Sequence, residues 1–325
     1  MQISVFVPQY GVIEAITPAF RSFNTANEFL TVFGKKPVFK VEYVGLNDYV
    51  PANNGEYTIK TDRLLKDVIN TDLLIIPPTF GDTEAGIRAN AEAIPYFKKL
   101  HLNGSSLASL CIGAFLLAET GLLNGRKCST HWAYISEFKE KYPLVEVEDG
   151  AIITEHDNIY SSGGASSLWN LILYLVEKFS DRETAVMISK YFALDIGRDS
   201  QSQFAIFRGQ KNHGDPEIQK VQDHIEMKYD DKITVEDLAN FINMGRRTFE
   251  RRFKDATNNT PIEYIQRVRI EAAKKFFEAS RKNVSEVMYD VGYTDTKAFR
   301  DIFRKITGLT PIEYRNKFAK VAKEV

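Results

Sequence analysis

Residues 247–264 read RTFERRFKDATNNTPIEY, and residues 297–314 read KAFRDIFRKITGLTPIEY. The two stretches share the frame F-x-x-x-F-x-x-x-T-x-x-T-P-I-E-Y and lie 50 residues apart. An internal repeat of this kind indicates one supersecondary unit that is present twice. Each copy contains two phenylalanines four residues apart, which fall on one face of a helix: Phe249 and Phe253, then Phe299 and Phe303.

Each copy ends in the tetrapeptide TPIE, at residues 260–263 and 310–313. Threonine as N-cap, proline at the first helical position and glutamate at the third form a capping box, which starts a helix. A short amphipathic stretch precedes each copy, VEDLANF at residues 235–241, with Thr234 as its N-cap, and SEVMYDV at residues 285–291.

A tight turn follows each short stretch, NMG at residues 243–245 and GYTD at residues 292–295. A short helix, a tight turn with glycine and a second helix make a helix-turn-helix unit. Every segment after Pro216 has helical periodicity, so we expect an all-α C-terminal domain with two such units.

With the phenylalanines turned inward, the second helix of each unit leaves a polar and mostly basic face exposed. A plain helical bundle made by duplication would also have solvated basic faces, but two such faces on equivalent helices favour contact with phosphates and base edges in a major groove. The candidate DNA-contacting residues are Arg246, Arg247, Glu250 and Arg251 in the first unit and Thr296, Lys297, Arg300 and Arg304 in the second.

The region from about residue 215 to 318 resembles the AraC/XylS family, in which a linker helix, here residues 261–279, joins two helix-turn-helix units. Met288 departs from the small residue that is usual in the first helix of the second unit. The resemblance implies a transcription regulator that binds promoter double-stranded DNA.

The first part of the chain alternates short apolar runs, such as residues 3–8, 72–76 and 106–110, with helical patterns, such as residues 84–100. This rhythm predicts an α/β domain in which helices cover both faces of a mostly parallel, flavodoxin-like sheet in three layers. We expect this domain to span residues 1–204, a linker to span 205–215, and the DNA-binding domain to span 216–325.

Cys111 lies in LCIGAF, residues 110–115, where a predicted strand turns into a helix. Helix amides and the helix dipole at such a turn favour a thiolate, and α/β enzymes often hold a nucleophile there. His131 follows in STHW, residues 129–132.

These stretches resemble the class I glutamine-amidotransferase-like superfamily of PfpI type, and within it the GlxA-like regulators, which fuse that domain to an AraC-type module. The resemblance covers about residues 1–204 and implies an acid, cysteine and histidine at Glu14, Cys111 and His131. It also implies a homodimer and a nitrogenous metabolite as effector. The matching stretches are LCIGAFLLAETGLLNGRKCSTHW at residues 110–132, EAITP at 14–18, YSSGG at 160–164 and GRDSQSQF at 197–204.

Three departures weaken the interpretation of this domain as an enzyme. Pro78 stands where relatives often have a glycine whose amide helps to form the oxyanion site, and proline has no N–H to donate. Ile112 replaces a small polar residue after the cysteine, and Asn170 replaces an aspartate. Cys111 and His131 could be inert core residues, a pocket that binds a ligand without turnover, or the centre of a cysteine hydrolase or amidase. We expect the second, with Glu14, Cys111 and His131 as a vestigial triad.

Composition and charge exclude few classes of protein, because the net charge is only −1. Two cysteines cannot form a disulfide framework, and five histidines show no spacing of metal ligands. No signal peptide, membrane span or phosphate-binding glycine loop is evident, so we expect a cytoplasmic protein with no metal and no cofactor.

Overall fold

The structure, a computed structural model, describes residues 1–197, 200–211 and 213–319. It divides into two compact units between Gln201 and Ser202, three residues before the predicted boundary. The whole of the predicted linker, residues 205–215, therefore falls within the second unit. Some predicted parts lie outside the described residues: positions 198 and 199 of the GRDSQSQF stretch, position 212 of the linker, and residues 320–325 of the DNA-binding domain.

The first unit is built on a seven-stranded sheet in the order β10-β11-β7-β6-β1-β2-β5. Its strands run parallel, except that β10 at one edge is antiparallel to β11. The predicted mostly parallel sheet is therefore confirmed. The strands are β1 (Gln2–Val7), β2 (Lys40–Gly45), β5 (Arg63–Leu64), β6 (Leu73–Ile76), β7 (Ser106–Ser109), β10 (Ile153–His156) and β11 (Ile159–Ser162).

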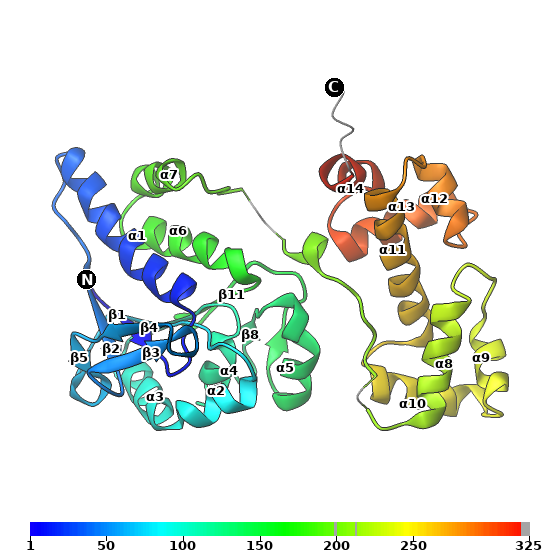
Figure 1. The fold of residues 1–325 in the computed structure, drawn as a ribbon, viewed down its shortest axis with the longest axis horizontal. Helices are drawn as coiled ribbons and strands as arrows, with labels where there is room; N and C mark the ends of the chain where they lie inside the picture. The colour runs from blue at the N-terminus through cyan, green and yellow to red at the C-terminus, as the bar shows by residue number, and fades with distance from the viewer. Residues whose placement is uncertain (198–199, 212, 320–325) are drawn as a thin grey trace. The chain divides into compact units, whose positions relative to one another are not determined.

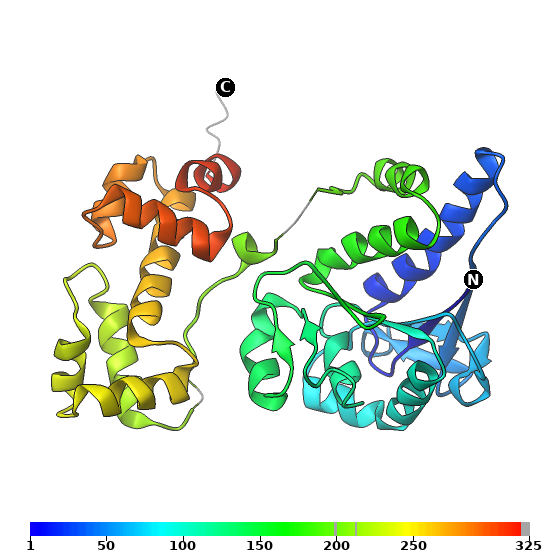
Figure 2. The same ribbon diagram turned by 180° about the vertical axis from the view of Figure 1, so that it is seen from behind.

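Helices cover both faces of this sheet, as the continuous apolar strand LLII of β6 requires. One face carries α1 (Ile13–Val32), α6 (Leu168–Phe179) and α7 (Arg182–Tyr191). The other carries α2 (Thr83–Ala89), α3 (Ile94–Leu102), α4 (Gly113–Ala118) and α5 (Ile135–Lys141). The three layers are visible in Figures 1 and 2. Two small sheets flank them, β3 (Tyr49–Ala52) with β4 (Tyr57–Lys60), and β8 (Lys127–Cys128) with β9 (Glu146–Val147).

The single helix predicted at residues 84–100 is wrong, because the chain breaks there at Asn90. This buried side chain donates to the carbonyls of Gly86 and Gln9 and accepts from the amide of Gln9. A 3-10 turn (Ala91–Ala93) then leads into α3. Hydrogen bonds to a distant loop thus interrupt a continuous helical pattern.

The second unit contains only helices among its described residues, which confirms the predicted all-α domain. Thr260 and Thr310 each accept from the amide three residues later, and the glutamate there caps in return, so both predicted capping boxes are present. The helices are α8 (Pro216–Met227), α9 (Val235–Phe241), α10 (Arg246–Thr257), α11 (Pro261–Ala279), α12 (Val284–Asp290), α13 (Thr296–Thr307) and α14 (Pro311–Phe318).

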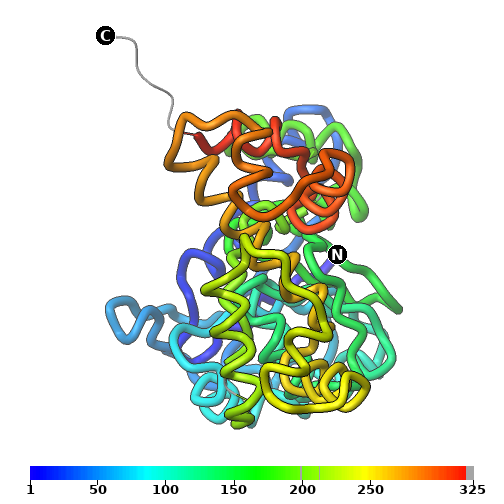
Figure 3. Tube along the Cα trace, turned by 90° about the vertical axis from the view of Figure 1, so that its right-hand side faces the viewer, coloured from blue at the N-terminus to red at the C-terminus, as the bar shows by residue number. Residues whose placement is uncertain are grey.

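Two small cores lie toward opposite ends of α11. Figures 1 and 3 show the helices around them, α8 to α10 at one end of α11 and α12 to α14 at the other. The first half of α11 contributes Tyr264 and Ile265 to one core, and the second half contributes Ile270 and Phe277 to the other. The four predicted inward phenylalanines are fully buried, two in each core. Each core belongs to one helix-turn-helix unit, formed by α9 with α10 and by α12 with α13.

Part of the predicted linker packs on α11. The Lys274 ammonium donates to the carbonyl of Ala205 (2.5 Å), and Glu271 accepts from the amide of Phe207 (3.2 Å). Lys274 and Glu271 also form a buried ion pair, 2.8 Å between Nζ and Oε2. This stretch of main chain is therefore docked onto the helical unit by specific polar contacts.

Candidate functional site

Helices α10 and α13 present the surface that could enter a DNA groove. Each follows the turn of its unit, and the Asp295 side chain caps α13 by accepting from the amide of Ala298 (2.6 Å). The predicted DNA-contacting residues all lie on these two helices. Seven are exposed and Glu250 is half-buried: Arg246, Arg247, Glu250, Arg251, Thr296, Lys297, Arg300 and Arg304.

The arginines of α10 differ in whether they form an ion pair with a carboxylate. Arg246 pairs with Glu250 one turn along the helix (3.2 Å). Arg252 makes two hydrogen bonds to Asp215, the N-cap of α8, and so has a structural role. Within residues 213–319, no carboxylate lies within ion-pair distance of the other predicted basic residues: Arg247, Arg251, Lys297, Arg300 and Arg304. Their charges are available to a phosphate or a base.

Cys111 occupies the turn between β7 and α4 and has a left-handed backbone, with φ of +55°. The amide of Cys111 donates to the carbonyl of Ser162 at the end of β11 (3.1 Å). The turn also presses against the end of β6, since a Cβ on Gly113 would lie 2.3 Å from the carbonyl oxygen of Ile76. A non-glycine residue held at positive φ is strained, and such strain gathers at functional sites.

The expectation that this turn favours a thiolate is not met. Cys111 is only 8% exposed, and burial raises the pKa of its thiol to about 12, against a smaller opposing effect of a hydrogen bond from the backbone of Ile112. Desolvation disfavours the charged form more than this hydrogen bond favours it. The thiol is therefore protonated at neutral pH.

The neutral His131 ring is held in the tautomer that carries its proton on Nε2, so Nε2 cannot accept a proton. Its Nδ1 accepts from the amide of Ala133 (3.1 Å), so in the neutral ring the proton is on Nε2. Burial also lowers the pKa of His131. The ring lies close to Trp132 and Tyr134, with centroids 5.3 and 5.9 Å away.

Glu14 lies exposed in the first turn of α1 and is engaged by Asn53, whose amide nitrogen donates to the carboxylate at 3.1 and 3.3 Å. The Asn53 oxygen also accepts from the amide of Ile13 (3.0 Å) and so caps α1. The hydroxyl of Thr130 donates to the carbonyl of Cys111 (3.2 Å), which brings the loop that carries His131 against the cysteine turn. In the described part of the chain, no hydrogen bond or ion pair joins the three triad side chains to one another.

The loops after β1 and β6 meet beside this turn. The amide of Val12 donates to the carbonyl of Pro78 (3.1 Å), and Gly11 bridges to Thr79. The sheet order reverses between β1 and β6, and open α/β sheets bind ligands at the carboxyl ends of strands at such a point. The geometry therefore marks this edge as the candidate ligand site.

Gln201 is a residue whose importance the sequence did not reveal. Its fully buried side chain accepts from the amides of Gly164 (2.7 Å) and Trp132 (3.2 Å). It donates to the carbonyls of Thr130 (2.9 Å) and Ala151 (3.1 Å). In the sequence, the GRDSQSQF and YSSGG stretches contribute to the family resemblance. They do not indicate a role for Gln201. Gln201 thus joins the loop of His131 to the loop after β11.

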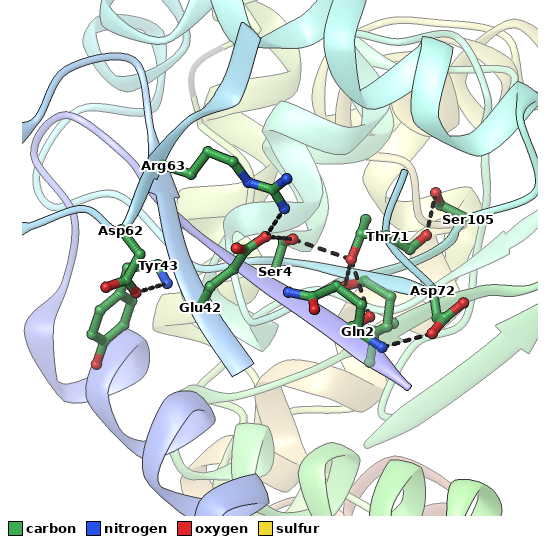
Figure 4. A network of polar contacts seen from close by, with 10 residues as sticks. Gln2, Ser4, Glu42, Tyr43, Asp62, Arg63, Thr71, Asp72 and Ser105 are labelled. Carbon is green, nitrogen blue, oxygen red and sulfur yellow. Dashed lines mark hydrogen bonds and ion pairs between the residues drawn. The ribbon is translucent and has the colours of Figure 1, made fainter. Parts of the chain in front are cut away.

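A separate polar network lies at the opposite edge of the sheet, where the strands begin (Figure 4). The Ser4 hydroxyl of β1 donates to Glu42 of β2 (2.9 Å) and lies 3.1 Å from the hydroxyl of Thr71. Arg63 of β5 pairs with the same Glu42 carboxylate. A cavity of about 470 Å³ opens beside these groups. The network ties the amino ends of three strands together and is remote from the Cys111 turn.

In residues 1–197, 200–211 and 213–319, no helix is long and apolar enough to cross a membrane. In the same residues, no cluster of three or more histidine, cysteine, aspartate or glutamate side chains is placed to hold a metal ion.

Two family models match the chain, the DJ-1/PfpI family over residues 16–178 and a helix-turn-helix domain over residues 238–317. The HTH-type transcriptional regulator CdhR of Pseudomonas aeruginosa is 28% identical over 270 residues, which are 82% of this chain and 78% of that protein. The HTH-type transcriptional regulator GbdR of the same species is 25% identical over 225 residues, 69% of this chain. The chain spans only 61% of the length of GbdR.

The crystal structure of an AraC family transcriptional regulator from Pseudomonas putida matches with a TM-score of 0.51 at 19% identity, over 59% of this chain and 98% of that one. At this identity the likeness shows a shared fold. The DJ-1/PfpI model matches half of the chain, the part that holds the Cys111 turn and every strand of the seven-stranded sheet except β1. The chain therefore belongs to the DJ-1/PfpI family, and an AraC-type helix-turn-helix domain follows that region in the same polypeptide.

Proposed function

We propose that the protein is a sequence-specific, DNA-binding transcription regulator whose first unit binds a small effector without changing it chemically. The observation that carries the proposal is a set of exposed basic side chains on two helices, α10 and α13, that have no ion-pair partner among the described residues: Arg247, Arg251, Lys297, Arg300 and Arg304. Two relatives named as HTH-type transcriptional regulators support it. Promoter DNA is the partner that we expect, and the cytoplasm is the compartment that we expect.

The two recognition helices carry different residues at equivalent positions of the repeat. Arg247 corresponds to Lys297, and Glu250 corresponds to Arg300. Arginine is suited to guanine, whereas glutamate accepts from cytosine. One chain is therefore expected to contact two DNA segments of unlike sequence. In a homodimer, which the family resemblance implies, this pair of segments occurs twice.

The groups around Cys111 support binding rather than turnover. A protonated thiol, an imidazole with its proton on Nε2 and the missing amide at Pro78 each remove one component of an acyl-transfer site. The strained turn and the surrounding loops remain suited to hold a small molecule. The GlxA-like resemblance suggests a nitrogenous metabolite as that molecule.

DNA binding is tested by the affinity of the full chain for double-stranded DNA selected from a random library. We expect tight binding to selected duplexes, weaker binding to an unselected duplex, and an affinity that falls steeply as salt rises, because phosphate contacts release counterions. Equal affinity for selected and unselected duplexes would contradict sequence-specific binding.

The second candidate is a cysteine hydrolase or amidase, and the left-handed backbone of Cys111 favours it. A thermal-shift screen of amines, amino acids and betaines, followed by turnover assays on each compound that raises the melting temperature, separates the two candidates. Binding without consumption supports an effector. Consumption by the native chain that the Cys111→Ala variant abolishes would establish the enzyme instead.

A further inference from the structure

Arg269 lies where α11 passes from one helix-turn-helix core to the other. Its predecessor Val268 packs against the first core, and its successor Ile270 belongs to the second. The side chain of Arg269 is half-buried. It lies at the point of α11 that separates the two cores.

The guanidinium of Arg269 donates to main-chain carbonyls from both halves of the helical unit. Its Nε donates to Tyr229 (2.7 Å) and one terminal nitrogen donates to Asp231 (2.8 Å). Both carbonyls belong to the loop between α8 and α9 in the first half of the unit. The other terminal nitrogen donates to Gly292 (3.0 Å), in the turn that leads into α13.

The groups around this guanidinium leave it little freedom. Gly292 has a φ of +78°, and a Cβ there would lie 2.6 Å from the carbonyl oxygen of Asp230 and 3.0 Å from a terminal nitrogen of Arg269. The Tyr293 ring covers the guanidinium, with 5.3 Å from the ring centroid to Cζ. The Tyr229 ring, from the first half, packs against the second core. The two halves therefore meet around Arg269 as well as through α11.

We propose that Arg269 is a positioning residue that fixes α13 relative to α10 and so sets the number of base pairs between the two DNA segments that one chain contacts. The proposal rests on the DNA-binding function proposed above. Three carbonyls from two separate segments are held by one planar group, so a rotation of one half against the other breaks at least one of these bonds. Two recognition helices that cannot rotate freely accept a narrow range of spacings along the groove.

Lysine is the informative replacement for Arg269. It keeps the positive charge and much of the aliphatic stem, but its single ammonium cannot reproduce the planar fork that reaches three carbonyls. Lys275→Ala is the matched control, because it removes an exposed charge from the same helix. Thermal melting of each variant checks that the second unit remains folded.

The first experiment measures the placement of the helices without DNA, by electron–electron spin distances in the full chain. Spin labels go on Asp255→Cys in α10 and Lys305→Cys in α13, both exposed positions, while the native Cys111 and Cys128 are buried. We expect a narrow distance distribution for the parent and for Lys275→Ala, and a clearly broader one for Arg269→Lys. An equally narrow distribution in Arg269→Lys would overturn the proposal.

The second experiment measures the affinity of each full-length variant for a selected duplex with one to three base pairs inserted between the two contacted segments. We expect the parent to lose about tenfold or more in affinity on the first insertion, and Arg269→Lys to lose much less. If Arg269→Lys binds more weakly than the parent by the same factor at every spacing, Arg269 has a merely structural role and the proposal is overturned. A parent chain that binds no selected duplex would overturn the DNA-binding function itself, whatever the spin distances show.

Discussion

Arginines on the recognition helices are expected to divide into two roles according to their position along the helix. Arg247 and Arg300 lie in the first turns of α10 and α13, the end that points into the groove in helix-turn-helix proteins. Replacement of either by alanine should weaken binding to the selected duplex by about 1–3 kcal/mol and relax base preference at one segment. Arg304 lies further along α13, so Arg304→Ala should weaken all sequences alike and reduce the salt dependence.

Binding titrations on base-substituted duplexes at several salt concentrations measure both effects. Phe249→Ala is the structural control. Loss of this fully buried ring should destabilise the second unit by about 3–5 kcal/mol and abolish binding only through unfolding. Unchanged affinity and base preference in folded Arg247→Ala and Arg300→Ala would refute the assignment of these helices to DNA recognition.

The buried thiols make the stability of the first unit sensitive to alkaline pH. Burial raises the pKa of Cys128 to about 12, well above its ordinary value. The unfolded chain therefore loses this proton at a lower pH than the folded chain, so the stabilising effect is complete below about pH 9 and disappears as pH rises toward 12. Urea titrations between pH 9 and 11 give the unfolding free energy of the parent and of Cys128→Ala. With each pH unit, this free energy should fall by about 1.4 kcal/mol less in Cys128→Ala than in the parent. An equal slope in the two proteins would mean that Cys128 ionises freely in the fold.

At the scale of helices and strands, sequence was most informative where one local pattern determines the structure. The TPIE capping boxes place the starts of α11 and α14 because every interaction of the motif lies within four residues. The repeat also identified the four inward phenylalanines and the exposed faces opposite them. The turn at Cys111 was recognisable for the same reason, since a short apolar strand leads directly into a helical pattern.

Elements that depend on contacts between distant residues were not predictable in this way. Asn90 divides one predicted helix because its side chain bonds to Gln9, 81 residues away. Asn53 engages Glu14 across 39 residues. The ionisation of Cys111 likewise depends on how deeply the surrounding loops bury it, which the local helix start does not determine.

Gln201 provides a test of such a distant contact. Gln201→Ala leaves two amides and two carbonyls of buried loops without their partner, and each unsatisfied buried group costs about 1–3 kcal/mol before relaxation or water entry. We expect a loss of at least about 2 kcal/mol in the unfolding free energy of the first unit, measured by urea titration. Asn103→Ala, which truncates an exposed amide in the same unit, should change it by less than about 0.5 kcal/mol. Equal effects of the two replacements would show that the Gln201 contacts do not support these loops.

At the scale of the whole chain, the two compact units have different proposed functions, effector binding in the first and DNA binding in the second. The DJ-1/PfpI unit has large cores on both faces of its sheet, with a strained turn at the carboxyl edge where a ligand could bind. The helical unit has two small cores, and its main chain near residues 205–207 is anchored to α11. We expect the helical unit to recognise two separate segments of one DNA duplex.

Hydroxyl-radical footprinting of the full chain on a selected duplex shows whether both segments are contacted. Two recognition helices on one chain should protect two segments about 10–10.5 base pairs apart on one face of the DNA. Arg300→Ala should weaken protection of one segment while the other remains protected. A single short protected segment for each chain, or uniform protection of any sequence, would contradict the account.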